Sequence, residues 1–357
     1  MQSLASLVAA KYRKGIHEPE GQLQVLKEEP GSLFWYKAPQ FLYNQPVKKV
    51  MIGGRDRYLD AGVFAEPKRT LYSLHYAGTI GTAGVVYLPQ TRTVIKETAI
   101  GYETAPIEHS VLTAIRTSPA VHLPGTSISI IKMASEGYYH FLLEALPKLL
   151  FCKELIDGVQ QVVISGNDNN AILSWLQFAG VPAEKLRFTD GLTNYTYDQL
   201  LFSLDLVTDM QPSPWAVQQL RQAFPAPQNK KPSRWIWASR SDSPSRNVAW
   251  EDELLQCFPK FEKVVFSTLS PSDVIALMNE CLVFCGPHGA AFSNIVFQQE
   301  GTHVIEMYPE ENHFFRPVYS RLADVCGLKH LYVTHDFQTK QNITQKIQDA
   351  LNTLQIG

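Results

Sequence analysis

The chain has few cysteines, no long apolar run and almost no net charge, and each absence removes a class of protein. Its five cysteines include no C-x-x-C pair, so no metal-binding or redox pair is indicated and a reducing cytoplasm fits best. No run reaches the roughly 18 apolar residues of a membrane-spanning helix. With a net charge of −2 at pH 7, the whole chain has no electrostatic attraction to nucleic acid. We therefore expect no nucleic-acid partner.

The first 20 residues carry a short apolar patch that is followed by positive charges. A secretory signal has the opposite order, so we expect a cytoplasmic protein. A simple packing helix is one interpretation of this patch. An amphipathic helix that makes peripheral contact with the inner membrane face is the open alternative.

Length and composition indicate a two-domain globular enzyme. The chain has 357 residues, of which 45% are hydrophobic and 18% charged, enough apolar material for sizeable cores. The stretch 225–233 holds three prolines and no apolar run, which is typical of a linker. We expect an N-terminal domain at 1–224 (β-rich extension 1–118, Rossmann-like part 119–224), a linker at 225–234, a second Rossmann-like domain at 235–336, and a helix at 337–357 that packs back on the first domain.

Strands and helices alternate on both sides of this linker. Apolar runs at 127–132, 161–166, 235–239 and 281–285 predict buried strands, and the stretches between them have helical spacing. This βαβ order predicts α/β architecture with parallel sheets. Before residue 118 the short runs and Pro/Gly breaks are instead typical of antiparallel hairpins.

A glycine turn follows the predicted strand 281–285. Gly286, His288 and Gly289 precede a small-residue run that starts at Ala290 and can open a helix through Asn294. A strand, a glycine turn and a helix N-terminus together offer backbone N–H groups to a phosphate. A His between glycines is also common as a plain turn residue, so the motif alone leaves both interpretations open.

Charged residues follow two other predicted strands of the second half. Arg240 and Arg246 lie in a polar loop after the strand 235–239, and guanidinium groups there can clamp a diphosphate. Glu306 ends the apolar run 303–307, where a carboxylate can meet ribose or sugar hydroxyls. Arginines in polar surface loops are common, so either one alone is weak evidence.

In the first half, His140 and Glu144 lie four residues apart on a predicted helix at 138–152, so they share one helix face. His140 is a candidate general base because a neutral imidazole accepts a proton near pH 7. Glu144 can orient the imidazole or act as the base itself. Pro147 should kink this helix or end its first part. A satisfied core histidine is the alternative for His140.

Together these segments resemble glycosyltransferase family 61, and the chain is similar to its bacterial capsular and exopolysaccharide-type members, relatives of plant xylosyltransferases and animal O-linked N-acetylglucosaminyltransferases. Three stretches carry the resemblance in order: GYYHFLLEALPKL at 137–149, ASRSDSPSRNVAWEDEL at 238–254 and CGPHGAAFSNIVFQQEGTHVIEM at 285–307. The resemblance covers about 127–333. It points to His140, Glu144, Arg240, Arg246, Glu251, His288, Gly289, Asn294 and Glu306.

The resemblance implies a GT-B fold, with two Rossmann-like halves facing across a cleft, and an inverting, metal-independent reaction without a cofactor. It implies a nucleotide-sugar donor, UDP-linked, and a glycan or lipid-linked glycan acceptor. His140 and Glu144 would be catalytic. The donor site would comprise Arg240, Arg246, Gly286, His288, Gly289, Ala290, Asn294 and Glu306. Asp205 and Asp209 are too far apart for a D-x-D metal motif.

The chain departs from the family pattern at Phe141, Trp250, Ala291, Phe292 and Ser272–Asp273. These changes leave two alternatives open. One is a polysaccharide pyruvyl-transferase-like enzyme that uses phosphoenolpyruvate. The other is a catalytically silent glycan- or nucleotide-binding module.

Overall fold

The computed structural model describes residues 23–43, 50–52, 55–57, 61–91, 93–99, 119–166, 169–191, 193–204, 206–207, 211–227, 230–243, 245–310 and 317–356. Within these ranges no helix combines the length and apolar character needed to cross a membrane. The predicted N-terminal helix, Asp205 and Asp209 lie outside the described residues.

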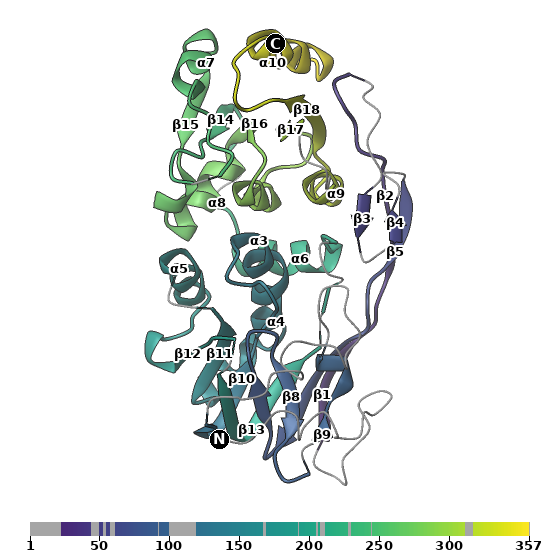
Figure 1. Cartoon of the computed structure of the whole chain (residues 1–357), viewed down its shortest axis with the longest axis vertical. Coiled ribbons are helices and arrows are strands. Elements are labelled where there is room, and N and C mark those ends of the chain that lie inside the picture. The colour runs from purple at the N-terminus through teal and green to yellow at the C-terminus, as the bar shows by residue number, and fades with distance from the viewer. Residues whose placement is uncertain are drawn as a thin grey trace. The chain divides into compact units, whose positions relative to one another are not determined.

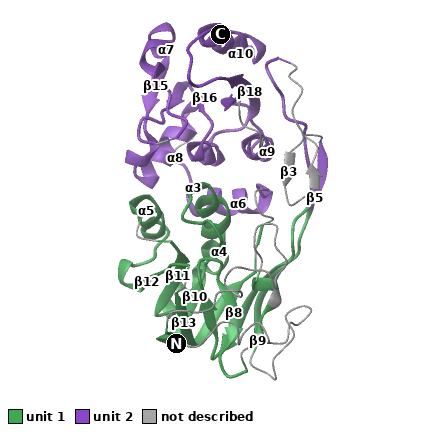
Figure 2. Cartoon of the chain, viewed as in Figure 1, with its two compact units in different colours: residues 1–32, 65–209 green, residues 33–64, 210–357 purple. Residues whose placement is uncertain are grey.

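The chain divides into two compact units. The first comprises residues 1–32 and 65–209, and the second comprises residues 33–64 and 210–357 (Figure 2). The second unit therefore takes in part of the predicted β-rich extension, and it begins well before the predicted linker.

The first unit is built on a nine-stranded mixed sheet (Figure 1). Its strands are β1 (Leu23–Glu29), β6 (Arg69–His75), β7 (Gly78–Ile80), β8 (Val85–Leu88), β9 (Thr93–Val94), β10 (Val121–Ser129), β11 (Gln161–Ser165), β12 (Leu186–Thr189) and β13 (Asn194–Ser203). The part β12-β11-β10-β13 is parallel, which confirms the predicted βαβ rhythm. The early strands do not form a separate extension, because β6 and β7 pair antiparallel with β13 in the same sheet.

The central strand β10 is where the parallel order reverses, since β11 and β12 lie on one side of it and β13 on the other. The chain leaves β10 into a helical stretch made of α3 (Tyr138–His140), a π-helical turn (Phe141–Ala145) and α4 (Leu146–Phe151). The interruption predicted at Pro147 takes the form of a change in helix type, because the first α-helical part ends at His140 and a π turn precedes α4. The π turn lies directly before it, with the N–H of Leu146 bonded to the carbonyl of Phe141 five residues back, so the backbone stays helical around a residue that has no N–H.

Helix α5 (Asn170–Phe178) completes the βαβ unit between β11 and β12. The Asn169 side chain caps its N-terminus by accepting from the backbone N–H of Ala171. Gly180 follows its end with a φ of +94°, a conformation that favours glycine. This helix lies in one of the stretches for which helical spacing was predicted.

The second unit is built on a five-stranded, all-parallel sheet in the order β15-β14-β16-β17-β18. Its strands are β14 (Arg234–Ala238), β15 (Phe261–Val264), β16 (Cys281–Pro287), β17 (His303–Pro309) and β18 (Lys329–His335). The order reverses between β14 and β16, so the loops after these two strands flank the crevice where open α/β sheets bind ligands. The predicted α/β class is confirmed.

Helices cover both faces of this sheet in the way that a parallel sheet requires. They are α7 (Glu251–Cys257), α8 (Pro271–Asn279), a 3₁₀ helix (Ala290–Phe297), α9 (Val318–Val325) and α10 (Ile343–Thr353). Ser270 caps α8 by accepting from the N–H of Asp273, and Pro271 occupies its first turn. A buried core that includes Trp237, Cys285 and Met307 lies under α10.

Two helices pack differently from the prediction. Helix α6 (Pro214–Ala223), assigned to the first domain, is held on the second unit because Arg221 donates to the carbonyls of Val296 and Gln298. Helix α10 was expected to return to the first domain. Its apolar residues Ile347 and Leu351 instead join the core of the second unit, so that prediction is wrong. Helical periodicity shows which face is buried but not which partner buries it.

The segment 33–64 also belongs to the second unit, although it was predicted to be part of the first domain. It contains β2 (Leu33–Tyr36), β3 (Val50–Ile52), β4 (Arg55–Arg57) and β5 (Gly62–Ala65), which form the two-stranded sheets β2-β5 and β3-β4. The guanidinium of Arg321 on α9 lies over the rings of Tyr36 and Phe64. This contact holds the β2-β5 sheet to the second unit.

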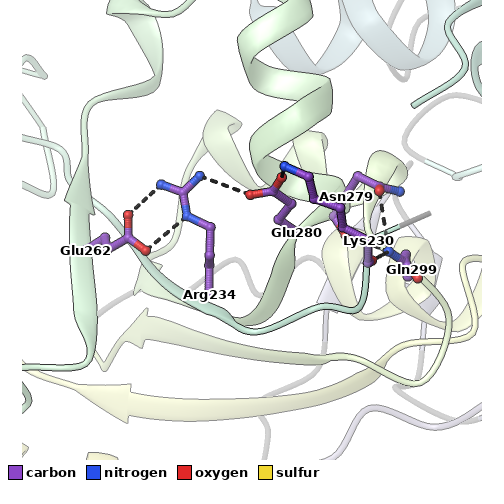
Figure 3. A network of polar contacts seen from close by, with 6 residues as sticks. All are labelled: Lys230, Arg234, Glu262, Asn279, Glu280 and Gln299. Atoms are coloured by element: carbon purple, nitrogen blue, oxygen red, sulfur yellow. Dashed lines mark hydrogen bonds and ion pairs between the residues drawn. The ribbon is translucent and has the colours of Figure 1, made fainter. Parts of the chain in front are cut away.

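A polar network closes the amino edge of the second sheet (Figure 3). Arg234 binds both carboxylate oxygens of Glu262, at 3.0 and 2.5 Å, and lies 3.7 Å from Glu280. Lys230 pairs with Glu280 at 2.6 Å. The network therefore anchors the predicted linker at the edge of the sheet opposite the loops after β14 and β16.

Candidate functional site

The glycine turn after β16 packs tightly against the end of β14. A Cβ atom on Gly286 would lie 2.7 Å from the carbonyl oxygen of Ala238. Only glycine allows this approach without moving the backbone of β14. The turn is therefore held at the point where the strand order reverses.

Gly289 makes room for Arg240. A Cβ atom on Gly289 would lie 1.7 Å from Nη1 of Arg240. The backbone of Gly289 is extended, with a φ of 170°, so the conformation itself does not demand glycine. The need for glycine here comes from the guanidinium that lies against the turn.

Arg240 and Arg246 form a like-charged pair at this edge. Arg240 donates only to neutral oxygens, those of Ser243 at 2.6 Å and Ser245 at 3.1 Å. In the described part of the chain neither arginine has a carboxylate within 4 Å. Burial lowers the pKa of Arg240 from its usual value, and the charge of Arg246 lowers it further. Among the described residues, the charge of Asp242 acts against these effects on Arg240 without forming an ion pair with it.

Glu251, to which the resemblance also points, contacts the start of the loop that carries Arg240 and Arg246 (the arginine loop). It is buried, and it accepts from Nε1 of Trp237 at 2.5 Å and from Oγ of Ser239 at 2.8 Å. Lys263 pairs with it at 2.7 Å. These contacts fix the residue that precedes Arg240, so Glu251 holds the loop in place.

His288, at the centre of the turn, hydrogen-bonds through Nδ1 to Oε1 of Glu306. The other carboxylate oxygen of Glu306 meets Nε2 of His330 at 2.8 Å. Glu306 is fully buried, and burial raises its pKa well above the usual 4.5, although Tyr332 and Arg246 act in the opposite direction. Burial lowers the pKa of His330 to about 3. The sequence did not single out His330, because strand alternation gives no sign of its contact with Glu306.

The buried carboxyl of Glu306 should leave a signature in the pH dependence of stability. Because its folded pKa exceeds the unfolded value near 4.5, the folded state keeps a proton that the unfolded state has lost. The free energy of unfolding should therefore fall as pH rises above about 4.5, with a limiting slope of about 1.4 kcal/mol per pH unit, until the folded pKa is passed.

Glu306→Gln should lack this fall, since an amide does not titrate. Urea unfolding of both proteins at several pH values between 4 and 8 measures the difference. Curves that stay parallel across the range would contradict a raised pKa for Glu306.

Aromatic rings enclose the exposed part of His288. Tyr308 on β17 lies 4.7 Å from its ring centroid and Tyr319 on α9 lies 5.3 Å away. Ala290 begins the 3₁₀ helix, while Asn294 within that helix is completely buried. The structure thus brings predicted residues together around the turn: Arg240, Gly286, His288, Gly289, Ala290 and Glu306. Arg246 lies close enough to Arg240 and Glu306 to lower the pKa of both.

In the first unit, the predicted contact between His140 and Glu144 forms, with Nδ1 and Oε2 2.8 Å apart. The Glu144 side chain is 2% exposed and that of His140 is 16% exposed, so the imidazole reaches the surface and the carboxylate does not. Glu144 sits in the π turn, a feature that is often found at functional sites. Lys132, which the sequence analysis missed, is buried with Nζ 3.8 Å from the same Oε2.

Lys132→Met should destabilise the first unit. It leaves a buried carboxylate without its ammonium neighbour, which typically costs about 3–5 kcal/mol in the free energy of unfolding. Urea unfolding at pH 7 checks this, with Lys153→Met as the control because Lys153 is exposed. Equal losses in the two variants would show that the Lys132–Glu144 pair contributes nothing specific.

Two departures from the family pattern fall in the cores. Phe141 is completely buried. Trp250 is also buried, where its ring meets His335 edge-on at 5.3 Å and its Nε1 donates to the carbonyl of Phe337 at 3.3 Å. Trp250 is therefore a packing residue of the second unit, and the substitution takes no polar group from the arginine loop. The described residues include no cluster of three or more His, Cys, Asp or Glu side chains that could hold a metal ion.

Comparison with known families gives one match. A family model described as Glycosyltransferase 61 matches residues 138–305, which supports the resemblance and a glycosyltransferase activity. No curated protein matches the chain. The matched region starts with α3 and ends in β17, so it includes His140, Arg240 and His288. Lys132, Glu306 and His330 lie outside it.

Proposed function

Because residues 138–305 match a glycosyltransferase family, we propose that the chain is an inverting, metal-independent glycosyltransferase. It moves a sugar from a nucleotide-sugar donor, UDP-linked, to a hydroxyl of a glycan or lipid-linked glycan. The observation that carries the proposal is the like-charged pair Arg240 and Arg246, which lies beside a glycine turn where the strand order reverses.

The donor diphosphate would bind at the carboxyl edge of the second sheet. Its oxygens accept from the guanidinium groups of Arg240 and Arg246 and from the first N–H groups of the 3₁₀ helix after Gly289, which have no acceptor within the helix. These positive groups also stabilise the diphosphate as it leaves. With Arg240 and Arg246 supplying this charge, the proposal needs no metal ion.

The transfer step follows from the contacts of His140. Glu144 accepts the proton of Nδ1, so Nε2 is the basic nitrogen of the neutral ring and can take a proton. The acceptor oxygen attacks the anomeric carbon as its proton passes to Nε2. The bond to the diphosphate breaks on the opposite face, and the leaving oxygen keeps the electron pair. The configuration at the anomeric carbon is inverted.

Glu306 takes a different role from the one first expected. A fully buried carboxyl that contacts two imidazoles supports an action through His288 rather than a direct contact with ribose. The GT-B arrangement and the cytoplasmic location implied by the resemblance remain part of the proposal.

A thermal-shift panel of UDP, GDP, ADP and CMP and their sugar conjugates, without and then with Mg²⁺ or Mn²⁺, tests the donor site. A ligand at 100 times its Kd should stabilise the fold by about 2.7 kcal/mol. We expect UDP compounds to stabilise the protein without metal. No shift with any nucleotide would contradict the proposal, and stabilisation by phosphoenolpyruvate alone would favour a pyruvyl transferase. Nucleotide binding without sugar transfer or donor hydrolysis would indicate a silent binding module.

A further inference from the structure

Three side chains, from β17, β18 and the turn after β16, form one hydrogen-bonded series. Nε2 of His330 meets Oε2 of Glu306 at 2.8 Å, and Oε1 of Glu306 meets Nδ1 of His288. The exposed fractions of the side chains are 5% for His330, 0% for Glu306 and 15% for His288. Only His288 reaches the surface, so a ligand would sense the other two through it.

His330, the buried end of this hydrogen-bonded series, fixes the direction of the hydrogen bond between His330 and Glu306. Nδ1 of His330 is buried and has no hydrogen-bond partner among the described residues. A buried N–H without an acceptor is rarer in proteins than an under-used acceptor. Burial also keeps the His330 ring neutral, since its pKa is lowered to about 3. The ring proton therefore lies on Nε2, and His330 donates to Oε2 of Glu306.

This donation leaves one place for a proton on Glu306. With Oε2 acting as acceptor, a proton on the carboxyl must lie on Oε1 and be donated to Nδ1 of His288. His288 then carries its own proton on Nε2. The carboxyl is 0% exposed and, among the described residues, no lysine or arginine nitrogen lies within 4 Å of it. This burial raises the pKa of Glu306 and favours the protonated state. Five titratable or charged groups interact with the carboxyl of Glu306 among the described residues. They are His288, His330, Arg246, Tyr319 and Tyr332.

We propose that His330 is a positioning residue that acts through Glu306 to present His288 with its proton on Nε2, as a hydrogen-bond donor to a diphosphate oxygen. The contact between His288 and a diphosphate rests on the proposed function. The position of the proton on Nε2 of His288 does not depend on it. His330 lies outside the family match over residues 138–305, so the match does not assign this role to it.

Histidine-ring ¹⁵N NMR at pH 7 on the whole chain tests the proton position directly. His330→Gln keeps an amide N–H that can donate to Oε2 of Glu306, and His330→Phe keeps the ring volume without a donor. We expect a protonated Nε2 on His288 in the wild type and in His330→Gln, and a protonated Nδ1 in His330→Phe. A wild-type His288 protonated on Nδ1, or the same tautomer in all three proteins, would overturn the proposal. The wild-type spectrum alone tests the position of the ring proton on His288, even if a variant fails to fold.

Titration with UDP gives the second readout. His330→Phe should bind UDP about tenfold more weakly than the wild type, and His330→Gln should stay within about threefold. Equal affinity in a folded His330→Phe would refute the ligand contact. If the wild type itself does not bind UDP, the proposed nucleotide site is wrong, while the tautomer comparison still decides the role of His330.

Discussion

His140→Ala is expected to lower the rate of sugar transfer by about 10²–10⁴-fold, the usual contribution of a general base. The reason is geometric. Glu144 holds Nδ1 of His140 at 2.8 Å and the imidazole side chain is 16% exposed, so the other ring nitrogen can meet an acceptor hydroxyl. Donor affinity should change little, because the donor is expected to bind in the second unit.

Steady-state kinetics with saturating donor measures the effect, and His122→Ala is the matched control. His122 also lies in the first unit beside an acidic partner, Asp198 at 3.3 Å, but its side chain is 55% exposed, so its loss should leave the rate unchanged. A His140→Ala rate within about tenfold of the wild type would end its assignment as the base. Glu144→Gln would then be the next variant to measure.

Gly289→Ala is expected to weaken UDP binding about 10–10²-fold although it removes no polar group. The new Cβ would lie 1.7 Å from Nη1 of Arg240, and the extended backbone of residue 289 accepts alanine. The flexible guanidinium must therefore move while the fold stays intact. The loss corresponds to about 1.5–3 kcal/mol, the net value of a hydrogen bond to a charged group.

A double-mutant cycle with Arg240→Ala separates this mechanism from general damage. If alanine at 289 acts only by displacing Arg240, it should add less than about 0.5 kcal/mol in the Arg240→Ala background. Arg234→Ala is the control, because Arg234 lies at the other end of β14 in the network of Figure 3. Fully additive losses would show that Gly289→Ala weakens binding by another route.

The sequence indicated most of the local structure for a simple physical reason. Buried parallel strands need continuous apolar runs, and β11, β14 and β16 fall on the predicted ones. Local residue types also match the helix ends, with Ser270 as the N-cap of α8 and a glycine after α5. The π turn before Pro147 was missed because sequence spacing predicts an interruption without showing how the backbone accommodates it.

Pairings between distant segments were less predictable. Strand β6 joins β13, and α10 packs in the second unit rather than on the first domain. Any apolar partner of the right shape can bury an apolar face, so the hydrophobic pattern of the sequence does not identify the partner. The domain limits differ for the same reason.

For the candidate site, the sequence by itself determined which chemical groups are available: one His–Glu pair, a further histidine and glutamate, two arginines after one strand and a glycine turn after another. His140 and Glu144 were predictable as neighbours because one helix carries both at a spacing of four residues. Only the tertiary structure decided that Arg240 lies on Gly289, that Lys132 lies beside Glu144 and that His330 lies behind Glu306. These contacts join residues from different strands and loops, and their burial sets the protonation states on which the chemistry depends.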